Sequence, residues 1–101
     1  MILGRRFVVV IDSQLDLFER EHAELIRECD RAEAAYDAAP RDEAEERYGE
    51  YMDLVAEGTE LLADLRDHYA ASLDERAAEK YAAAFNRAVR RRLPRFALEL
   101  E

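Results

Sequence analysis

The sequence predicts an all-α protein. It consists of a long antiparallel helical hairpin (about 13–37 and 42–71), a shorter third helix (about 73–93), and short extended or β segments at both termini. Three observations predict this class. Only three glycines and two prolines interrupt 101 residues that are half apolar and 39% charged, a composition that favours helices. Apolar residues recur at alternating steps of three and four along two stretches. A break at Pro40 separates those stretches, where a hairpin would turn.

The N-terminal segment is expected to be extended. Residues Phe7–Ile11 are mostly β-branched, and such residues suit strands better than helices. The run is too short for a signal peptide, because Asp12 follows it at once. No stretch of the sequence approaches the length of a membrane span. Cys29 is the only cysteine, so no internal disulfide forms, and we expect a cytoplasmic protein in a reducing compartment.

The two long helices are expected on either side of Pro40. The first would begin at Asp12 or Ser13 as N-cap, and the second at Asp42. The apolar stripe of the first helix comprises Leu15, Phe18, His22, Leu25, Cys29, Ala32 and Tyr36. That of the second comprises Ala44, Tyr48, Tyr51, Val55, Gly58, Leu62, Leu65 and Tyr69. Both stripes keep a heptad spacing, which is typical of helices packed as in a coiled coil or a three-helix bundle.

The third helix is expected to open with the capping box Ser72-Leu73-Asp74-Glu75 and to end at Pro94. Its inner face comprises Ala78, Tyr81, Phe85, Ala88 and Val89. Beyond it, Phe96, Leu98 and Leu100 alternate with other residues, which predicts a short strand or an extended packing arm.

A hairpin folded at Pro40 has a definite register, in which the numbers of facing residues sum to about 80. The expected pairs are Tyr36 with Ala44, Ala32 with Tyr48, Cys29 with Tyr51, Leu25 with Val55, His22 with Gly58, Phe18 with Leu62, and Leu15 with Leu65. Large residues repeatedly face small ones, as layers that interdigitate at constant density require. In this register His22 fills the space left by Gly58.

The tip of the hairpin is expected to be poorly covered, because the third helix is too short to reach it. Tyr36, Tyr48 and Tyr51 would then be partly exposed, and the C-terminal tail or a second subunit would cover them. An antiparallel homodimer would also bring the two terminal strands together. The hypothesis is therefore a homodimer or a complex with another protein.

Charge narrows the choice of partner. The net charge of −9 repels phosphate, which makes nucleic acid and anionic membranes poor partners. One basic run departs from this background: Arg87, Arg90, Arg91, Arg92 and Arg95. We favour ion pairs, within one chain or between subunits, between this run and acids of the second helix, namely Glu50, Asp53 and Glu57. The alternative is a docking patch for an acidic partner or a nucleic acid.

Metal ligation has weak candidates, and we expect no metal and no cofactor. Glu19-x-x-His22 has the spacing of di-iron helical bundles, but its second copy is missing. Two further pairs at similar heights would suit Mg²⁺: Glu21 with Glu24, and Glu57 with Glu60. Heptad phase places Glu57 and Glu60 on the solvent side, where such spacing arises by chance.

His68 and Cys29 also have two interpretations each. His68 is expected near Asp12 and Asp64, which would make either a pH-sensitive contact or an ordinary ion pair, and we favour the ion pair. Cys29 lies on the apolar stripe without a basic neighbour, so we expect an inert core thiol rather than a nucleophile.

The function that these observations favour is that of a non-enzymatic helical interaction module that associates with itself. The sequence shows no Gly-rich loop and no arrangement of Ser, His and Asp or of Cys and His for catalysis. A metal-dependent all-helical hydrolase that uses the glutamate cluster is one alternative. A small regulator that docks an acidic partner or a nucleic acid through the arginines of the third helix is the other.

Overall fold

The structure is a computed structural model that describes the fold of residues 2–98 and the side chains of residues 7–98. Within residues 2–98 the elements are α1 (Ile2–Glu21), α2 (Ala23–Ala38), α3 (Ala44–Ala70), α4 (Glu75–Arg92) and a 3-10 turn, η1 (Pro94–Phe96). No strand occurs in that range. The all-α class is therefore confirmed.

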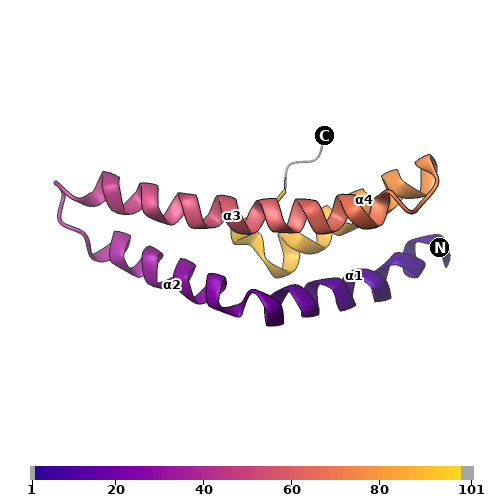
Figure 1. Cartoon of the computed structure of the whole chain (residues 1–101), viewed down its shortest axis with the longest axis horizontal. Helices are drawn as coiled ribbons and strands as arrows, with labels where there is room; N and C mark the ends of the chain where they lie inside the picture. Colours follow the sequence, from indigo (N-terminus) through magenta and orange to yellow (C-terminus); the bar gives the residue numbers. More distant parts are fainter. Residues whose placement is uncertain (1, 99–101) are drawn as a thin grey trace.

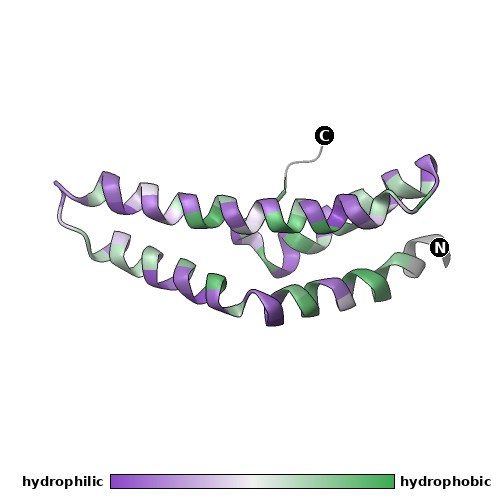
Figure 2. Ribbon diagram, viewed as in Figure 1, coloured by the Kyte–Doolittle hydropathy of each residue, from purple (hydrophilic) through white to green (hydrophobic). Residues whose placement is uncertain are grey.

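The molecule is elongated, with extents of 52 × 26 × 21 Å. α1 and α2 form a bent rod beside α3, and α2 runs antiparallel to α3 up to a turn at residues 39–43 (Figure 1). We refer to this turn and the adjoining ends of α2 and α3 as the tip, and to the opposite end as the base. From the base, α4 folds back and packs against both α1 and α3. Hydrophobic residues are concentrated along α1 and in the middle of α3 (Figure 2).

Tyr81 of α4 is at the centre of the base half of the core. It is fully buried, and its ring contacts Phe7 of α1, Tyr69 of α3 and Phe85, with centroids 4.7 to 5.9 Å apart. Its hydroxyl donates a 2.8 Å hydrogen bond to Oε1 of Gln14. The expected inner face of the third helix is buried at Tyr81, Phe85, Ala88 and Val89. One residue therefore joins three helices.

The extended N-terminal segment predicted from β-branching is wrong, because α1 includes Phe7–Ile11. Phe7 and Ile11 are one helical turn apart and are 4% and 3% exposed, whereas Val8 and Val9 are 51% and 70% exposed. This is the period of a helix packed on one side, and not the alternation of a strand. Burial against Tyr81 outweighs the weak intrinsic preference of valine for strands.

The single helix predicted over 13–37 is two helices that meet at His22. Residue 22 has φ −116° and ψ 29°, outside the helical region. Its N–H still bonds to the carbonyl of Phe18, and its carbonyl accepts from Ile26. Helical hydrogen bonding therefore persists through a bend, which lets α1 lean on α4 while α2 stays on α3.

The caps also differ from the prediction. Asp74 caps α4 and accepts a 2.9 Å bond from the N–H of Ala77, whereas Ser72 donates its hydroxyl to the carbonyl of Tyr69 and so closes α3. At the start of α3 the N-cap is Glu43, without a side-chain bond, and not Asp42. The expected caps at residues 12 and 13 lie inside α1.

The space at Gly58 is filled by Phe96 and not by His22. A methyl group built on Gly58 would overlap the Phe96 ring. Phe96 also packs edge-on against Phe18, with ring centroids 6.1 Å apart. The C-terminal segment therefore inserts between α1 and α3 as a 3-10 turn, with Leu98 buried after it, and not as a strand. Leu100, part of the expected strand, lies outside the described residues.

Candidate interaction surface

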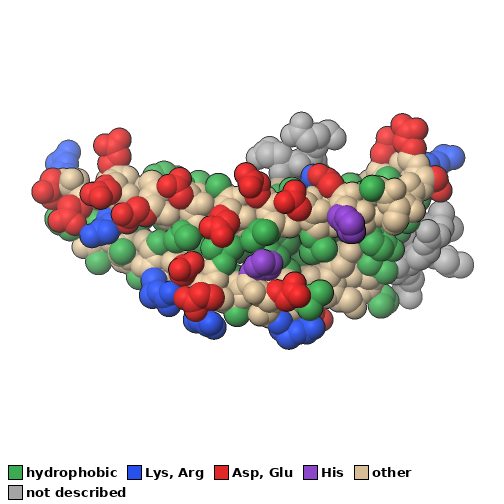
Figure 3. All heavy atoms as spheres, in the orientation of Figure 1, with side chains coloured by type: hydrophobic (Ala, Val, Ile, Leu, Met, Phe, Trp, Pro, Cys, Tyr) green, Lys and Arg blue, Asp and Glu red, His purple; other side chains and the backbone are tan. Residues whose placement is uncertain are grey.

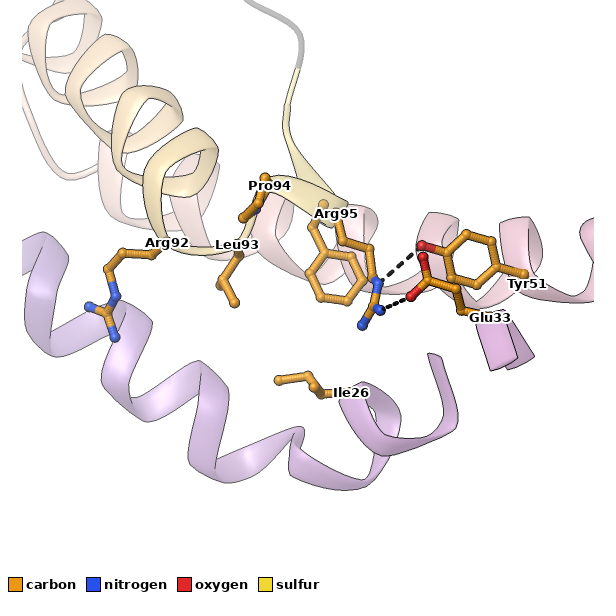
Figure 4. Close-up of a pocket in the computed structure, with 8 residues that line it drawn as sticks. Ile26, Glu33, Tyr51, Arg92, Leu93, Pro94 and Arg95 are labelled. Atoms are coloured by element: carbon orange, nitrogen blue, oxygen red, sulfur yellow. Dashed lines mark hydrogen bonds and ion pairs between the residues drawn. The ribbon is translucent and has the colours of Figure 1, made fainter. Parts of the chain in front are cut away.

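An open groove of about 510 Å³ lies where α4 meets η1. Pro94 ends α4, and the chain turns at Leu93, whose φ of −137° and ψ of 60° are not helical. The groove is lined by Ile26, Glu33, Tyr51, Arg92, Leu93, Pro94, Arg95 and Phe96 (Figure 4). It lies between α2, α3 and the corner at Leu93.

Arg95 connects this corner to both helices of the hairpin. Its guanidinium donates to the Tyr51 hydroxyl (3.1 Å), to Oδ1 of Asp30 (2.9 Å) and to Oε1 of Glu33 (2.7 Å). It also lies 5.7 Å from the centroid of the Tyr51 ring, within the range of a cation–π contact. Burial lowers the pKa of Arg95, but these hydrogen bonds outweigh it and leave that pKa above its usual value.

Arg92 makes the equivalent connection to α1. It donates to Oδ1 of Asp16 (2.8 Å), to Oε2 of Glu19 (3.2 Å) and to the backbone carbonyl of Asp12 (3.4 Å). The bond to Asp16 is the main reason that the pKa of Arg92 is raised.

The expectation that the arginines pair with acids of the second long helix is wrong for Arg92 and Arg95. Their carboxylate partners lie on α1 and α2, and not at Glu50, Asp53 or Glu57 of α3. The reason is that the last turn of α4 and the corner after it face the α1–α2 rod, whereas the predicted acids of α3 are exposed. Figure 3 shows that acidic side chains gather along α3.

The other three basic-run residues are in a different situation. Arg87, Arg90 and Arg91 are exposed, and none of them forms an ion pair within the part of the chain that the structure describes. Arg87 and Arg91 line a small hollow of about 110 Å³ beside Val8 and Ile11 of α1.

The tip presents aromatic side chains. Tyr36 of α2 and Tyr48 of α3 stack at a tilt, with centroids 5.2 Å apart, and they are 37% and 47% exposed. Met52 beside them is 39% exposed. Tyr51 is only half-buried, with Arg95 over its ring. The tip thus carries a small apolar patch, the tip patch, formed by Tyr36, Tyr48 and Met52.

The structure does not bring the metal-ligand candidates together. Glu19 binds Arg92, and Glu24 binds Arg27 and Arg31. The ring of His22 packs on Phe18 at 4.9 Å. Glu21, Glu57 and Glu60 are exposed. In residues 2–98, no group of three His, Cys, Asp or Glu side chains is arranged to hold a metal ion.

The structure also shows the surroundings of His68 and Cys29. His68 is exposed, and Asp12, its expected partner, is paired with Arg92. Cys29 is fully buried, and burial raises the pKa of its thiol despite the nearby charge of Arg95. A thiol in this state is a weak nucleophile.

One buried polar contact between α3 and α4 was not predicted from the sequence. Asn86 is 4% exposed on α4, and its side-chain carbonyl accepts a 3.0 Å hydrogen bond from Arg66 of α3. The sequence did contain a signal for this contact. Asn86 lies on the same helix face as Val89, among apolar residues, so its side chain would be buried and would need a hydrogen-bond partner.

Comparison with known proteins gives no assignment: no family model, no curated protein and no solved structure matches this chain. Within the described residues, no helix combines the length and the apolar character that crossing a membrane requires.

Proposed function

We propose that the protein is a non-enzymatic helical interaction module that associates with itself. The observation that supports this proposal best is the tip patch. Tyr36 and Tyr48, one from each arm of the hairpin, remain exposed together with Met52, whereas the other residues of the two apolar stripes are buried or half-buried. Aromatic residues and methionine are enriched where proteins contact one another. The α2–α3 hairpin then serves as an arm that carries this patch away from the core.

The groove at the α4–η1 corner supports a structural rather than a catalytic role for its charged side chains. Arg92 is paired with Asp16 and Glu19, and Arg95 is paired with Asp30 and Glu33. Neutralised charges of this kind hold elements together, and they are not poised to polarise a substrate.

Sedimentation equilibrium tests the proposal. We expect a mass above the 11.7 kDa of one chain, increasing with concentration. Replacing Tyr48 and Met52 with aspartate should shift the equilibrium towards the monomer by about tenfold, because charge on the tip patch opposes its burial. The matched control is Leu17→Asp, which alters an exposed apolar residue of α1. A wild-type chain that stays monomeric at every concentration up to about 1 mM contradicts the proposal.

A further inference from the structure

Two exposed stripes of opposite charge run along α3 and α4. The outer face of α4 carries basic residues with no ion pair among the described residues: Arg76, Lys80, Arg87 and Arg90. The outer face of α3, opposite Val55 and Leu62, carries acidic residues: Glu46, Glu50, Glu57 and Glu60. We call these sets the basic stripe and the acidic stripe. All eight residues are exposed.

The basic stripe has the opposite sign of charge to the chain as a whole. α4 has six basic and two acidic residues, while the chain carries a net charge of −9. Arg92 is the α4 cation that an acid of α1 neutralises. Concentrating unpaired cations on one helix of an acidic protein creates a surface that attracts an acidic one.

The two stripes have the same spacing. Steps of four, seven and three residues separate successive members in both, so each basic residue lies 30 positions after an acidic one. Arg76 corresponds to Glu46, Lys80 to Glu50, Arg87 to Glu57, and Arg90 to Glu60. At 1.5 Å per residue each stripe is about 21 Å long. Two parallel helices therefore bring all four pairs to the same heights along the helix axis.

This pairing cannot form within one molecule, because α4 runs antiparallel to α3 after the turn at residues 71–74 (Figure 1). A second copy can lie alongside the first with its long axis reversed. In that arrangement α4 of one copy runs parallel to the tip half of α3 of the other. A twofold axis then forms the contact twice. α2 packs against the tip half of α3, and the four residues of the acidic stripe are exposed.

We infer that two copies of this chain dock in reverse orientation, with the basic stripe of each on the acidic stripe of the other. This inference rests on the proposed function, and it names the surfaces and register of the self-association. Among the described residues, Glu50 is the one stripe member with a competing partner, since Arg47 of the same helix contacts it at 3.1 Å.

The same arrangement accounts for the exposed apolar residues. Reversal brings the tip of one copy to the end where α1 begins in the other. There Val8 and Val9 are 51% and 70% exposed. The tip patch and this valine pair come to the same end of the dimer, so apolar burial adds to the charge pairing.

Charge exchange between variants tests this register. Arg87→Glu with Arg90→Glu should weaken dimerisation at least about tenfold, and so should Glu57→Arg with Glu60→Arg, because each creates like-charge contacts. In a mixture of the two variants, a heterodimer has opposite charges in both contacts, because one contact keeps the native pairs and the other has the reversed pairs. A heterodimer should therefore form. The matched control is Arg20→Glu with Arg41→Glu, which makes the same charge change at exposed arginines outside the stripe. Circular dichroism verifies that each variant remains helical.

Sedimentation in low and in high salt separates the outcomes. Dimerisation should weaken markedly between about 0.01 and 1 M salt, as the Debye length falls from about 30 to about 3 Å. A dimer that withstands high salt and both charge reversals overturns this register and leaves the proposed function standing. A chain that is monomeric throughout overturns both. Tight binding of duplex DNA, lost in the Arg87 and Arg90 variant and without dimerisation, overturns the inference in favour of nucleic acid.

Discussion

At the scale of single residues, Gly58 decides how the C-terminal segment packs. The ring of Phe96 occupies the position that a side chain at residue 58 would take. Both residues are buried, with Phe96 only 1% exposed. A glycine in the middle of a helix costs about 1 kcal/mol relative to alanine, and here that cost is offset by the burial of a complete phenyl ring.

Gly58→Ala should therefore destabilise the protein by about 1–3 kcal/mol, because the Phe96 ring must move to admit a methyl group. Urea denaturation monitored by circular dichroism measures the change. Gly49 is the matched control: it lies in the same helix with nothing within 4 Å of a built methyl group. Gly49→Ala should be stabilising by up to about 1 kcal/mol. Equal stabilisation by both substitutions would disprove the packing described.

The contact at Gly58 illustrates what sequence alone could not supply. The heptad pattern correctly indicated that Gly58 faces inward, and it is buried. His22 was predicted to fill the space beside Gly58, because the heptad pattern relates only the two long helices to each other. Phe96 arrives from a segment that has no periodicity linking it to α3. Such a contact depends on where α4 ends, at Pro94, and not on any repeat.

At the scale of elements, the start of α4 depends on one side chain. Asp74 accepts the N–H of Ala77 at 2.9 Å, and its backbone is extended, with φ −67° and ψ 164°. This geometry satisfies one of the otherwise unpaired N–H groups at the start of a helix. The negative carboxylate also interacts favourably with the positive end of the helix dipole.

Asp74→Ala should destabilise the protein by about 1 kcal/mol, since it removes this cap. Asp42→Ala is the control, because Asp42 precedes α3 in sequence but does not cap it. Its effect should be within about 0.5 kcal/mol. Thermal unfolding of both variants provides the comparison. A larger loss for Asp42→Ala than for Asp74→Ala would restore the cap expected from sequence.

Element boundaries were predictable where the signals were local. The break at Pro40 and the end of α4 before Pro94 were both placed within a few residues. The segment Phe7–Ile11 was misassigned because its side chains favour strands, and the decisive contact with Tyr81 comes from α4. Local preference is weak, and burial against a distant helix overrides it.

At the scale of the whole molecule, Tyr81 makes the stability of the fold depend on pH. Burial raises the pKa of Tyr81 to about 12. The unfolded chain releases this proton near pH 10. The neutral hydroxyl therefore contributes fully to stability below pH 10, and the contribution is lost as pH rises from 10 towards 12.

The free energy of unfolding should fall by up to about 3 kcal/mol across that interval. Urea denaturation at a series of alkaline pH values measures this slope. In Tyr81→Phe the slope should become shallower, and the loss of the hydrogen bond should cost about 1 kcal/mol at neutral pH. Tyr36→Phe at the exposed tip should keep the wild-type slope. An unchanged slope in Tyr81→Phe would contradict this assignment.

The candidate surface was only partly accessible to sequence reasoning. The basic run was correctly noticed as a departure from the acidic background. Its division into two sets was not foreseen, because Arg92 and Arg95 turn towards acids of α1 and α2 at the corner after α4. The common spacing of Arg76 and Lys80 with Glu46 and Glu50 was visible in the sequence, but it acquires meaning only once α3 and α4 show which faces are exposed.

The hydrogen bond between Tyr81 and Gln14 also bears on how the chain reaches this structure. It joins residues 67 positions apart, whereas α2 and α3 meet across a turn of a few residues. Closing a short loop costs less conformational entropy than closing a long one. We therefore expect the hairpin to form early in folding, and α1 to dock on α4 as the later, slower event.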